Sequence, residues 1–284
     1  MENLPLFNLS GPVFLNFFGV IVFGVLVAVY LAIRFADRTA QRPPPAPPAE
    51  PDAMEVAYLQ GGVNQVIRTL VYDLDQRGYA VLARGEHIAA TDKAPSIDEL
   101  NALELCVLEA LRTRPTAQAL VEDKALHAKL EALLAPVRAR LAEQDFLRPA
   151  SVGKWKVYMQ ALGVGLIVGV AGVKLQQGYA AGQNLSYLLY LAIASVASVF
   201  ALGYVLTRGV ASRRGLAYLD VLRVAYADRL QEAIGHIGSP GPEARAFQGA
   251  SLFLIALYGF SALKGTTEAK FIETFERASG EGDD

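Results

Sequence analysis

The stretch VYMQALGVGLIVGVAGV, residues 157–173, is followed closely by LSYLLYLAIASVASVFALGYVL, residues 185–206, and neither stretch contains a charged side chain. A helix that crosses a hydrocarbon core about 30 Å thick needs roughly 17–25 mostly apolar residues, and both stretches are near that length. Because the connection between them is short, the two helices must run antiparallel. The sequence therefore predicts a transmembrane helical hairpin over residues 156–207.

The composition agrees with membrane helices joined to water-soluble regions. Hydrophobic residues make up 53% of the 284 residues and the mean hydropathy is +0.30, which is too apolar for an ordinary soluble domain, yet 19% of the residues are charged. The formal net charge of −2 argues against a nucleic-acid partner. Cys106 and the histidines His87, His127 and His236 show no spacing typical of metal ligands, so we expect no metal and no cofactor.

The first apolar segment, residues 12–34, is expected to be an uncleaved transmembrane anchor. Its core is long enough to span a membrane, and no Lys or Arg precedes it, whereas a cleaved secretory signal begins with basic residues. Arg34, Arg38 and Arg42 follow the segment. Since basic residues stay on the cytoplasmic side, we expect the N-terminus outside the cell and the next domain in the cytoplasm.

Basic residues also border the hairpin. Because only Lys174 lies between the two arms, both ends of the hairpin are expected to be cytoplasmic, in agreement with the direction of the first segment. We expect the flanking residues to anchor the hairpin at the membrane interface: Lys154, Trp155 and Lys156 before the first arm, and Arg208, Arg213 and Arg214 after the second.

Small residues in the arms predict where the helices pack. Gly165 and Gly169 form a GxxxG pair in the first arm, and Ala194 and Ser198 give the second arm a face of small residues. Such residues let helix backbones approach closely. We expect them to join the arms within one chain, with the interface of a homo-oligomer as the open alternative. No ionisable residue lies inside the apolar segments, which argues against ion-coupled transport.

Two regions separate the anchor from the hairpin. Residues 42–51, RPPPAPPAEP, predict a Pro-rich linker, either a semi-rigid stalk or a docking peptide. Residues 52–149 are expected to form a small helical, winged-helix-like cytoplasmic domain. It is expected to begin with a helix that is capped by Asp52 and broken at Gly61-Gly62, followed by a β-hairpin around Arg84-Gly85-Glu86. Two more helices follow: one is capped by Ser96 with Glu99 three residues on, and the other covers residues 116–144 and is interrupted near Pro136. Asp and Glu outnumber Lys and Arg in this region, so protein contacts are favoured over DNA binding.

Residues 208–284 are expected to form cytoplasmic amphipathic helices followed by a disordered acidic tail. One stretch, AFQGASLFLIALYGFSAL, residues 246–263, is long enough for a fourth transmembrane helix. Its glycines and hydroxyl groups, with Pro240 and Pro242 just before it, favour a helix folded back onto the cytoplasmic domain. The fold-class prediction is a mainly α membrane protein with three transmembrane helices, four being the alternative.

Three short motifs resemble an uncharacterised family of bacterial membrane proteins. They are EVAYLQGG at residues 55–62, TRGVASRRG at residues 207–215 and ALYGFSALKGT at residues 256–266. The resemblance implies an N-terminal anchor, a winged-helix-like cytoplasmic domain and paired transmembrane helices in the bacterial inner membrane. Members of that family often end in a Gly/Cys-rich tail, which this chain lacks. No catalytic residue is carried over by the resemblance.

These patterns favour an integral inner-membrane protein that acts as a membrane-anchored interaction or scaffold component. Its expected partners are the lipid bilayer and a cytoplasmic protein, with no nucleic acid. The sequence assigns no catalytic, cofactor-binding or metal-binding residue. The alternatives are an enzyme at the membrane surface and a membrane-bound regulator.

Overall fold

A computed structural model of the chain describes residues 11–82, 87–93, 100–180, 186–228, 242–260 and 274–275. Over these residues the chain is mainly helical, as predicted. It divides into two compact units. The first, called here the three-helix unit, comprises Met1–Arg38 and Arg148–Arg208; the second, the globular unit, comprises Thr39–Leu147 and Gly209–Asp284.

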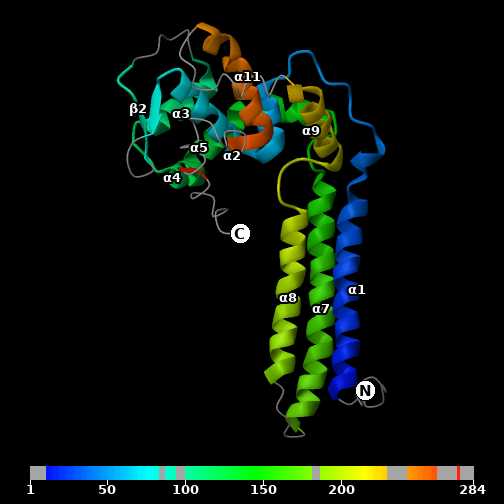
Figure 1. The fold of residues 1–284 in the computed structure, drawn as a ribbon. Coiled ribbons are helices and arrows are strands. Elements are labelled where there is room, and N and C mark those ends of the chain that lie inside the picture. Colours follow the sequence, from blue (N-terminus) through cyan, green and yellow to red (C-terminus); the bar gives the residue numbers. More distant parts are fainter. Residues whose placement is uncertain are drawn as a thin grey trace. The chain divides into compact units, whose positions relative to one another are not determined.

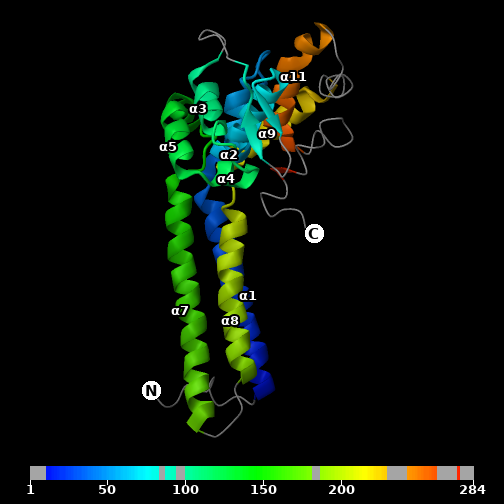
Figure 2. The same cartoon turned by 90° about the vertical axis from the view of Figure 1, so that its left-hand side faces the viewer.

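The three-helix unit is made of α1 (Gly11–Ala36), α7 (Ala150–Ala180) and α8 (Ser186–Leu206), which lie side by side (Figures 1 and 2). Among the described residues these three helices are long and apolar enough to cross a membrane. Only 22% of the residues in each apolar window are buried within the chain. A bundle that faced water would bury far more of its apolar surface, so this unit indicates a membrane protein.

The globular unit begins with α2 (Ala53–Gln76), whose start and break are confirmed. The Asp52 carboxylate accepts a hydrogen bond from the backbone N–H of Met54, at 2.8 Å, which caps the helix. The helix is kinked at Gly61 and Gly62, and the φ angle of +65° at Gly62 favours glycine because it has no Cβ. Gly78, with φ +76°, follows the end of the helix as predicted.

The predicted β-hairpin is also present. Strands β1 (Ala80–Leu82) and β2 (Ile88–Ala90) pair antiparallel, with Ala80 opposite Ala90. The predicted turn around Arg84-Gly85-Glu86 lies outside the described residues.

The helix predicted to start after Ser96 begins later in the structure. Helix α3 (Ala102–Leu111) is capped by Asn101, whose side chain accepts hydrogen bonds from the N–H groups of Leu103 and Glu104, both at 2.9 Å. The Glu104 carboxylate in turn accepts from the Asn101 N–H at 2.8 Å. The sequence contains two successive capping signals, Ser96 with Glu99 and Asn101 with Glu104, and the second caps α3. Ser96 and Glu99 lie outside the described residues.

The single helix predicted over residues 116–144 is three helices. They are α4 (Ala117–Glu122), α5 (Lys124–Leu133) and α6 (Ala135–Glu143). The break near Pro136 is confirmed, because this proline lies in the first turn of α6. The additional break is at Asp123, which leaves the helical conformation and caps α5 through its side chain.

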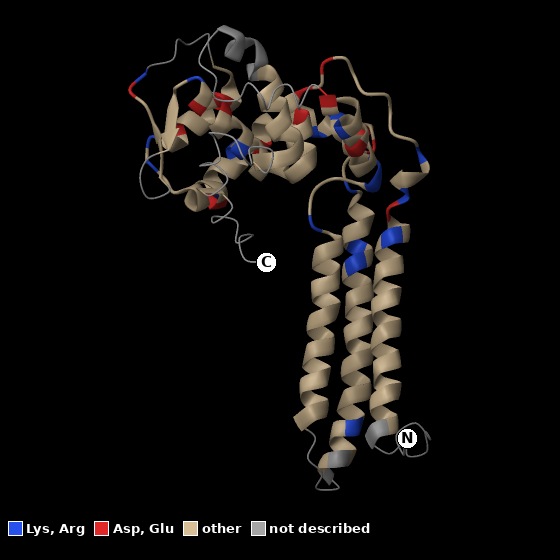
Figure 3. Cartoon of the chain, in the orientation of Figure 1, with Lys and Arg blue, Asp and Glu red and all other residues tan. Residues whose placement is uncertain are grey.

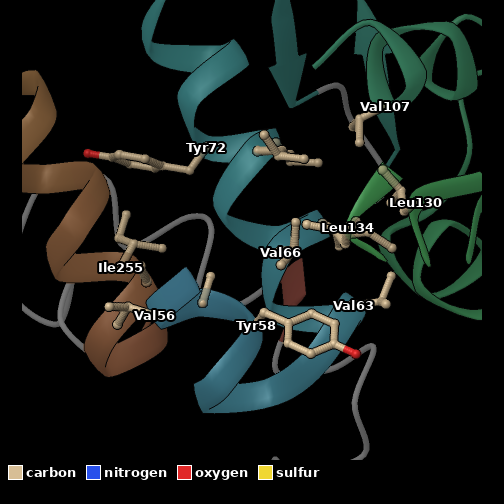
Figure 4. Close-up of a cluster of buried hydrophobic side chains, with 14 of the residues drawn as sticks. Val56, Tyr58, Val63, Val66, Tyr72, Val107, Leu130, Leu134 and Ile255 are labelled. Carbon is tan, nitrogen blue, oxygen red and sulfur yellow. The ribbon is translucent and has the colours of Figure 1, made fainter. Parts of the chain in front are cut away.

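Two C-terminal helices complete the core of this unit. The first is α9 (Arg213–Ala225), where Leu219 and Leu222 of the predicted apolar stripe are buried and Leu216 is exposed. The second is α11 (Pro242–Tyr258), which packs against α2 and buries Leu254, Ile255 and Leu257. Figure 4 shows α2 between α11, with Ile255, and the side chains of Val107, Leu130 and Leu134.

Burial of α11 supports the prediction that residues 246–263 do not span the membrane. Its described apolar part, Gly249–Tyr258, is shorter than a transmembrane helix. The Gln65 side-chain amide donates a 2.7 Å hydrogen bond to the carbonyl of Ile255, near the C-terminal end of α11. This bond and the apolar contacts hold α11 in the globular unit. Residues 261–263 and the predicted acidic tail lie outside the described residues.

The Pro-rich linker is fastened to the globular unit near both of its ends. The Arg42 guanidinium pairs with the Asp145 carboxylate at 2.6 Å. The Tyr226 hydroxyl donates a hydrogen bond to the carbonyl of Pro48. The segment therefore contacts this unit at Arg42 and Pro48, and its role as a stalk or a docking peptide stays a prediction.

Candidate membrane-embedded site

Aromatic residues mark both ends of the apolar surface on α7 and α8. Tyr158 is exposed near the start of α7 and Tyr179 near its end. At about 1.5 Å per residue, the 21 positions from Tyr158 to Tyr179 correspond to roughly 31 Å, and Lys174 lies inside this interval, five residues before Tyr179. Tyr187 and Tyr204 are exposed near the two ends of α8. Exposed aromatic belts with this separation are typical of helices that cross a bilayer.

The charges of the three-helix unit gather at one end. Figure 3 shows basic residues where α1 and α7 adjoin the connecting segments. After Lys156, the basic residue of α7 is Lys174, near its other end. Residues 148–208 contain no Asp or Glu. The predicted anchoring residues Lys154, Trp155, Lys156 and Arg208 all belong to this end. Their role in anchoring stays a prediction.

Hydrogen bonds from Lys156 and Arg148 tie the C-terminal end of α8 to the start of α7. The Lys156 ammonium donates to the Thr207 hydroxyl at 3.1 Å. The Arg148 guanidinium donates to the carbonyls of Thr207 and, at 3.2 Å, Arg208. The last carbonyls of a helix have no intrahelical partner and carry a partial negative charge, so cations stabilise this end. The sequence reasoning did not single out Arg148, although a basic residue just before the hairpin was a signal for it.

Arg213 and Arg214, also predicted to anchor the hairpin, belong to the globular unit. They open α9, and the Arg214 guanidinium donates a 2.8 Å hydrogen bond to the carbonyl of Gln144. The same guanidinium lies 5.6 Å from the centre of the Phe146 ring. Arg214 therefore fastens α9 within the globular unit.

The glycine face predicted to join the arms does not lie between them. A Cβ built on Gly165 or Gly169 has no neighbour within 4 Å, and Ala194 and Ser198 are exposed. Among the α7 glycines whose surroundings are described, Gly163 is the one at which a built Cβ would meet another helix, at Val25 of α1. Positions two residues apart point roughly 200° apart on a helix with about 3.6 residues per turn, so only one of Gly163 and Gly165 can face the neighbouring helices. A role of Gly165 and Gly169 in helix packing therefore stays a prediction.

A buried amide occupies the contact between α7 and α8. The Gln160 side chain is buried and its Nε2 donates a 3.0 Å hydrogen bond to the carbonyl of Val199. A Cβ built on Gly203 would overlap this amide, so the glycine provides the space that Gln160 fills. A polar group in hydrocarbon is costly unless it is paired, and this contact meets that requirement. Gln160 was noted in the sequence as a polar residue inside the first arm, but Gly203 was not connected with it.

Two histidines of the globular unit bind backbone groups. The His87 ring donates to the carbonyl of Arg114 at 2.9 Å, and the His127 ring donates to the carbonyl of Val121 at 2.7 Å. His236 lies outside the described residues. Within the part of the chain that the structure describes, no group of three or more His, Cys, Asp and Glu side chains could hold a metal ion.

Two carboxylates share one guanidinium at the junction of α2 and α3. Arg77 lies 2.7 Å from the Asp73 carboxylate and 3.2 Å from the Glu104 carboxylate. Asp73 and Glu104 are both buried. Burial raises the pKa of Asp73 to about 6, and Arg77 only partly offsets this effect.

The raised pKa of Asp73 predicts a pH-dependent stability. In the unfolded chain an aspartate loses its proton near pH 4, whereas Asp73 in the folded chain keeps it to about pH 6. The folded state therefore binds more protons in this window, and the free energy of unfolding falls as the pH rises from about 4 to about 6. Asp73→Asn removes this titration. Thermal unfolding of the full chain in detergent should show the variant gaining stability relative to wild type between pH 4 and pH 6; parallel curves would contradict the expectation.

The chain was compared with protein-family models, with curated proteins and with solved structures, and none of them matches it. The resemblance to a bacterial membrane-protein family therefore stays a prediction.

Proposed function

We propose that the protein is a scaffold or interaction component of the bacterial inner membrane, with its N-terminus outside and its globular unit in the cytoplasm. The observation that carries the proposal is the three-helix unit. Its apolar surface has the length of a bilayer core, and its basic residues gather at one end. Basic residues at a single end favour the cytoplasmic side for the segments that continue from it into the globular unit.

The globular unit is proposed to recruit a protein partner. The two segments of α2, broken at Gly61 and Gly62, are followed by the β-hairpin, an order consistent with the winged-helix-like arrangement that we propose for residues 52–149. Several large apolar side chains are exposed on this unit, among them Val81, Leu105 and Val224. Val224 is 81% exposed, so a bound protein can be reached from this position.

Site-specific photo-crosslinking in native membranes tests this proposal. A photoreactive residue is placed in the full chain at Val81, Leu105 or Val224, and at Phe23 of α1 as a lipid-facing control. We expect one discrete adduct with a second protein from a position of the globular unit and none from Phe23. Adducts restricted to lipid and to the chain itself, from all four positions, would overturn the proposal.

A further inference from the structure

The basic residues at one end of the three-helix unit form a set that we call the basic collar: Arg34, Arg38, Arg148, Lys154, Lys156 and Arg208. The set draws on three parts of the unit, the last turn of α1 with the residues just after it, the start of α7 and the segment that follows α8. Asp37, the acidic residue nearest in sequence to α1, is buried and interacts electrostatically with Arg148. The collar therefore carries a net positive charge.

The members of the collar divide into two kinds. Arg148 and Lys156 are partly buried and donate to the Thr207 carbonyl and hydroxyl groups. Arg34, Arg38 and Lys154 are exposed; Arg208 is exposed too, but it interacts within the protein. The first kind holds the ends of α7 and α8 together, and the second kind presents cations to the surroundings.

Apolar surface adjoins the exposed cations directly. Phe35, next to Arg34, is 71% exposed, and Val157, three residues after Lys154, is 63% exposed. Trp155 is also exposed, and its ring meets Tyr158 edge to face, with 6.1 Å between the ring centres. Cations beside an indole ring and exposed aliphatic groups match the chemistry of a lipid, which places a phosphate at the end of its acyl chains.

We infer that the basic collar binds the phosphate groups of anionic phospholipids and so selects these lipids from the surrounding bilayer. The inference rests on the membrane insertion in the proposed function, but not on a protein partner. A cation close to a membrane surface favours an anionic lipid by roughly fivefold, and the effect decreases as salt screens the charges. Three exposed cations on adjacent elements therefore give a preference well above that of a single residue.

The test is the lipid that the full chain retains. The protein is reconstituted in vesicles of equal parts phosphatidylglycerol and phosphatidylcholine, extracted in a mild detergent, and its bound lipids are measured by mass spectrometry. The triple variant Arg34→Gln, Arg38→Gln, Lys154→Gln removes these exposed cations and leaves Arg148, Lys156 and Arg208 in place. Lys174→Gln, which removes the basic residue near the other end of α7, is the matched control.

For wild type and for Lys174→Gln we expect bound phosphatidylglycerol to exceed phosphatidylcholine by about fivefold or more at low salt. In the triple variant the ratio should fall close to one. A ratio near one in wild type, or the same enrichment in the triple variant, would overturn the inference. Failure of this inference and failure of the proposed function are distinguished by cysteine labelling of the same samples. If lipid selection is absent but the labelling shows an unchanged membrane topology, the inference fails and the proposed function stands.

Discussion

Replacement of Gly203 by leucine is expected to separate α7 from α8. A side chain at this position overlaps the Gln160 amide, which is buried and bonded to the carbonyl of Val199. Overpacking of this kind costs about 1–3 kcal/mol, and the lost interhelical hydrogen bond adds about 0.6 kcal/mol. Thermal unfolding of the full chain in detergent measures the loss.

Two variants make this expectation specific. Gly169→Leu, on a face of α7 with no neighbour within 4 Å of a built Cβ, should leave the unfolding temperature of the monomer unchanged. Gln160→Ala removes the side chain that the new leucine would meet, so adding it to Gly203→Leu should restore part of the stability. Equal losses for Gly203→Leu and Gly169→Leu would show that the helices pack differently. A lowered oligomeric state for Gly169→Leu would support the homo-oligomer alternative for Gly165 and Gly169.

In the globular unit, Gly215→Ala should lower stability although alanine is the better helix former. A Cβ at Gly215 in α9 overlaps the backbone carbonyl of Phe146 and lies 3.0 Å from Leu59. That carbonyl cannot move freely, because it accepts a 2.8 Å hydrogen bond from the N–H of Ser212. The Phe146 ring is also stacked on Tyr218, with 4.6 Å between the ring centres. We expect a loss of about 1–3 kcal/mol, measured by chemical unfolding or by faster proteolysis of the unit.

The control for this variant is the same exchange at another helical glycine. Gly249 in α11 is exposed and a Cβ built on it meets nothing within 4 Å. Gly249→Ala should therefore be neutral, or stabilise by up to about 1 kcal/mol through helix propensity. If both exchanges raise stability equally, then α9 does not pack on Phe146 as described.

The features that the sequence predicted correctly depend on local information. A charge-free run of sufficient length predicts a candidate span without knowledge of any neighbour, and all three spans are present among the described residues. The Asp52 cap, the break at Gly61 and Gly62 and the pairing of residues on either side of the hairpin are local in the same sense. Each is set by backbone groups a few residues away.

The features that were missed depend on partners distant in sequence. The GxxxG letters do not show which side of α7 faces α1 and α8, and the residues that pack there are Gly163 and Gln160. The role of Gly203 depends on an amide 43 residues earlier in the chain. Arg148 is likewise defined by carbonyls beyond the end of α8. To predict such residues, one must know which face of each helix points toward its neighbours. Hydropathy alone does not give this information.

The most direct test of the proposed topology is the labelling of single cysteines by a membrane-impermeant maleimide in sealed cells. Cys106 is first replaced by serine, and a cysteine is then placed at Ala119, which is exposed in the globular unit, or at Gly182, between α7 and α8 in the sequence. We predict that Gly182→Cys reacts in sealed cells and that Ala119→Cys reacts only after the membrane is permeabilised. Labelling of Ala119→Cys in sealed cells, with Gly182→Cys protected, would contradict the proposed arrangement.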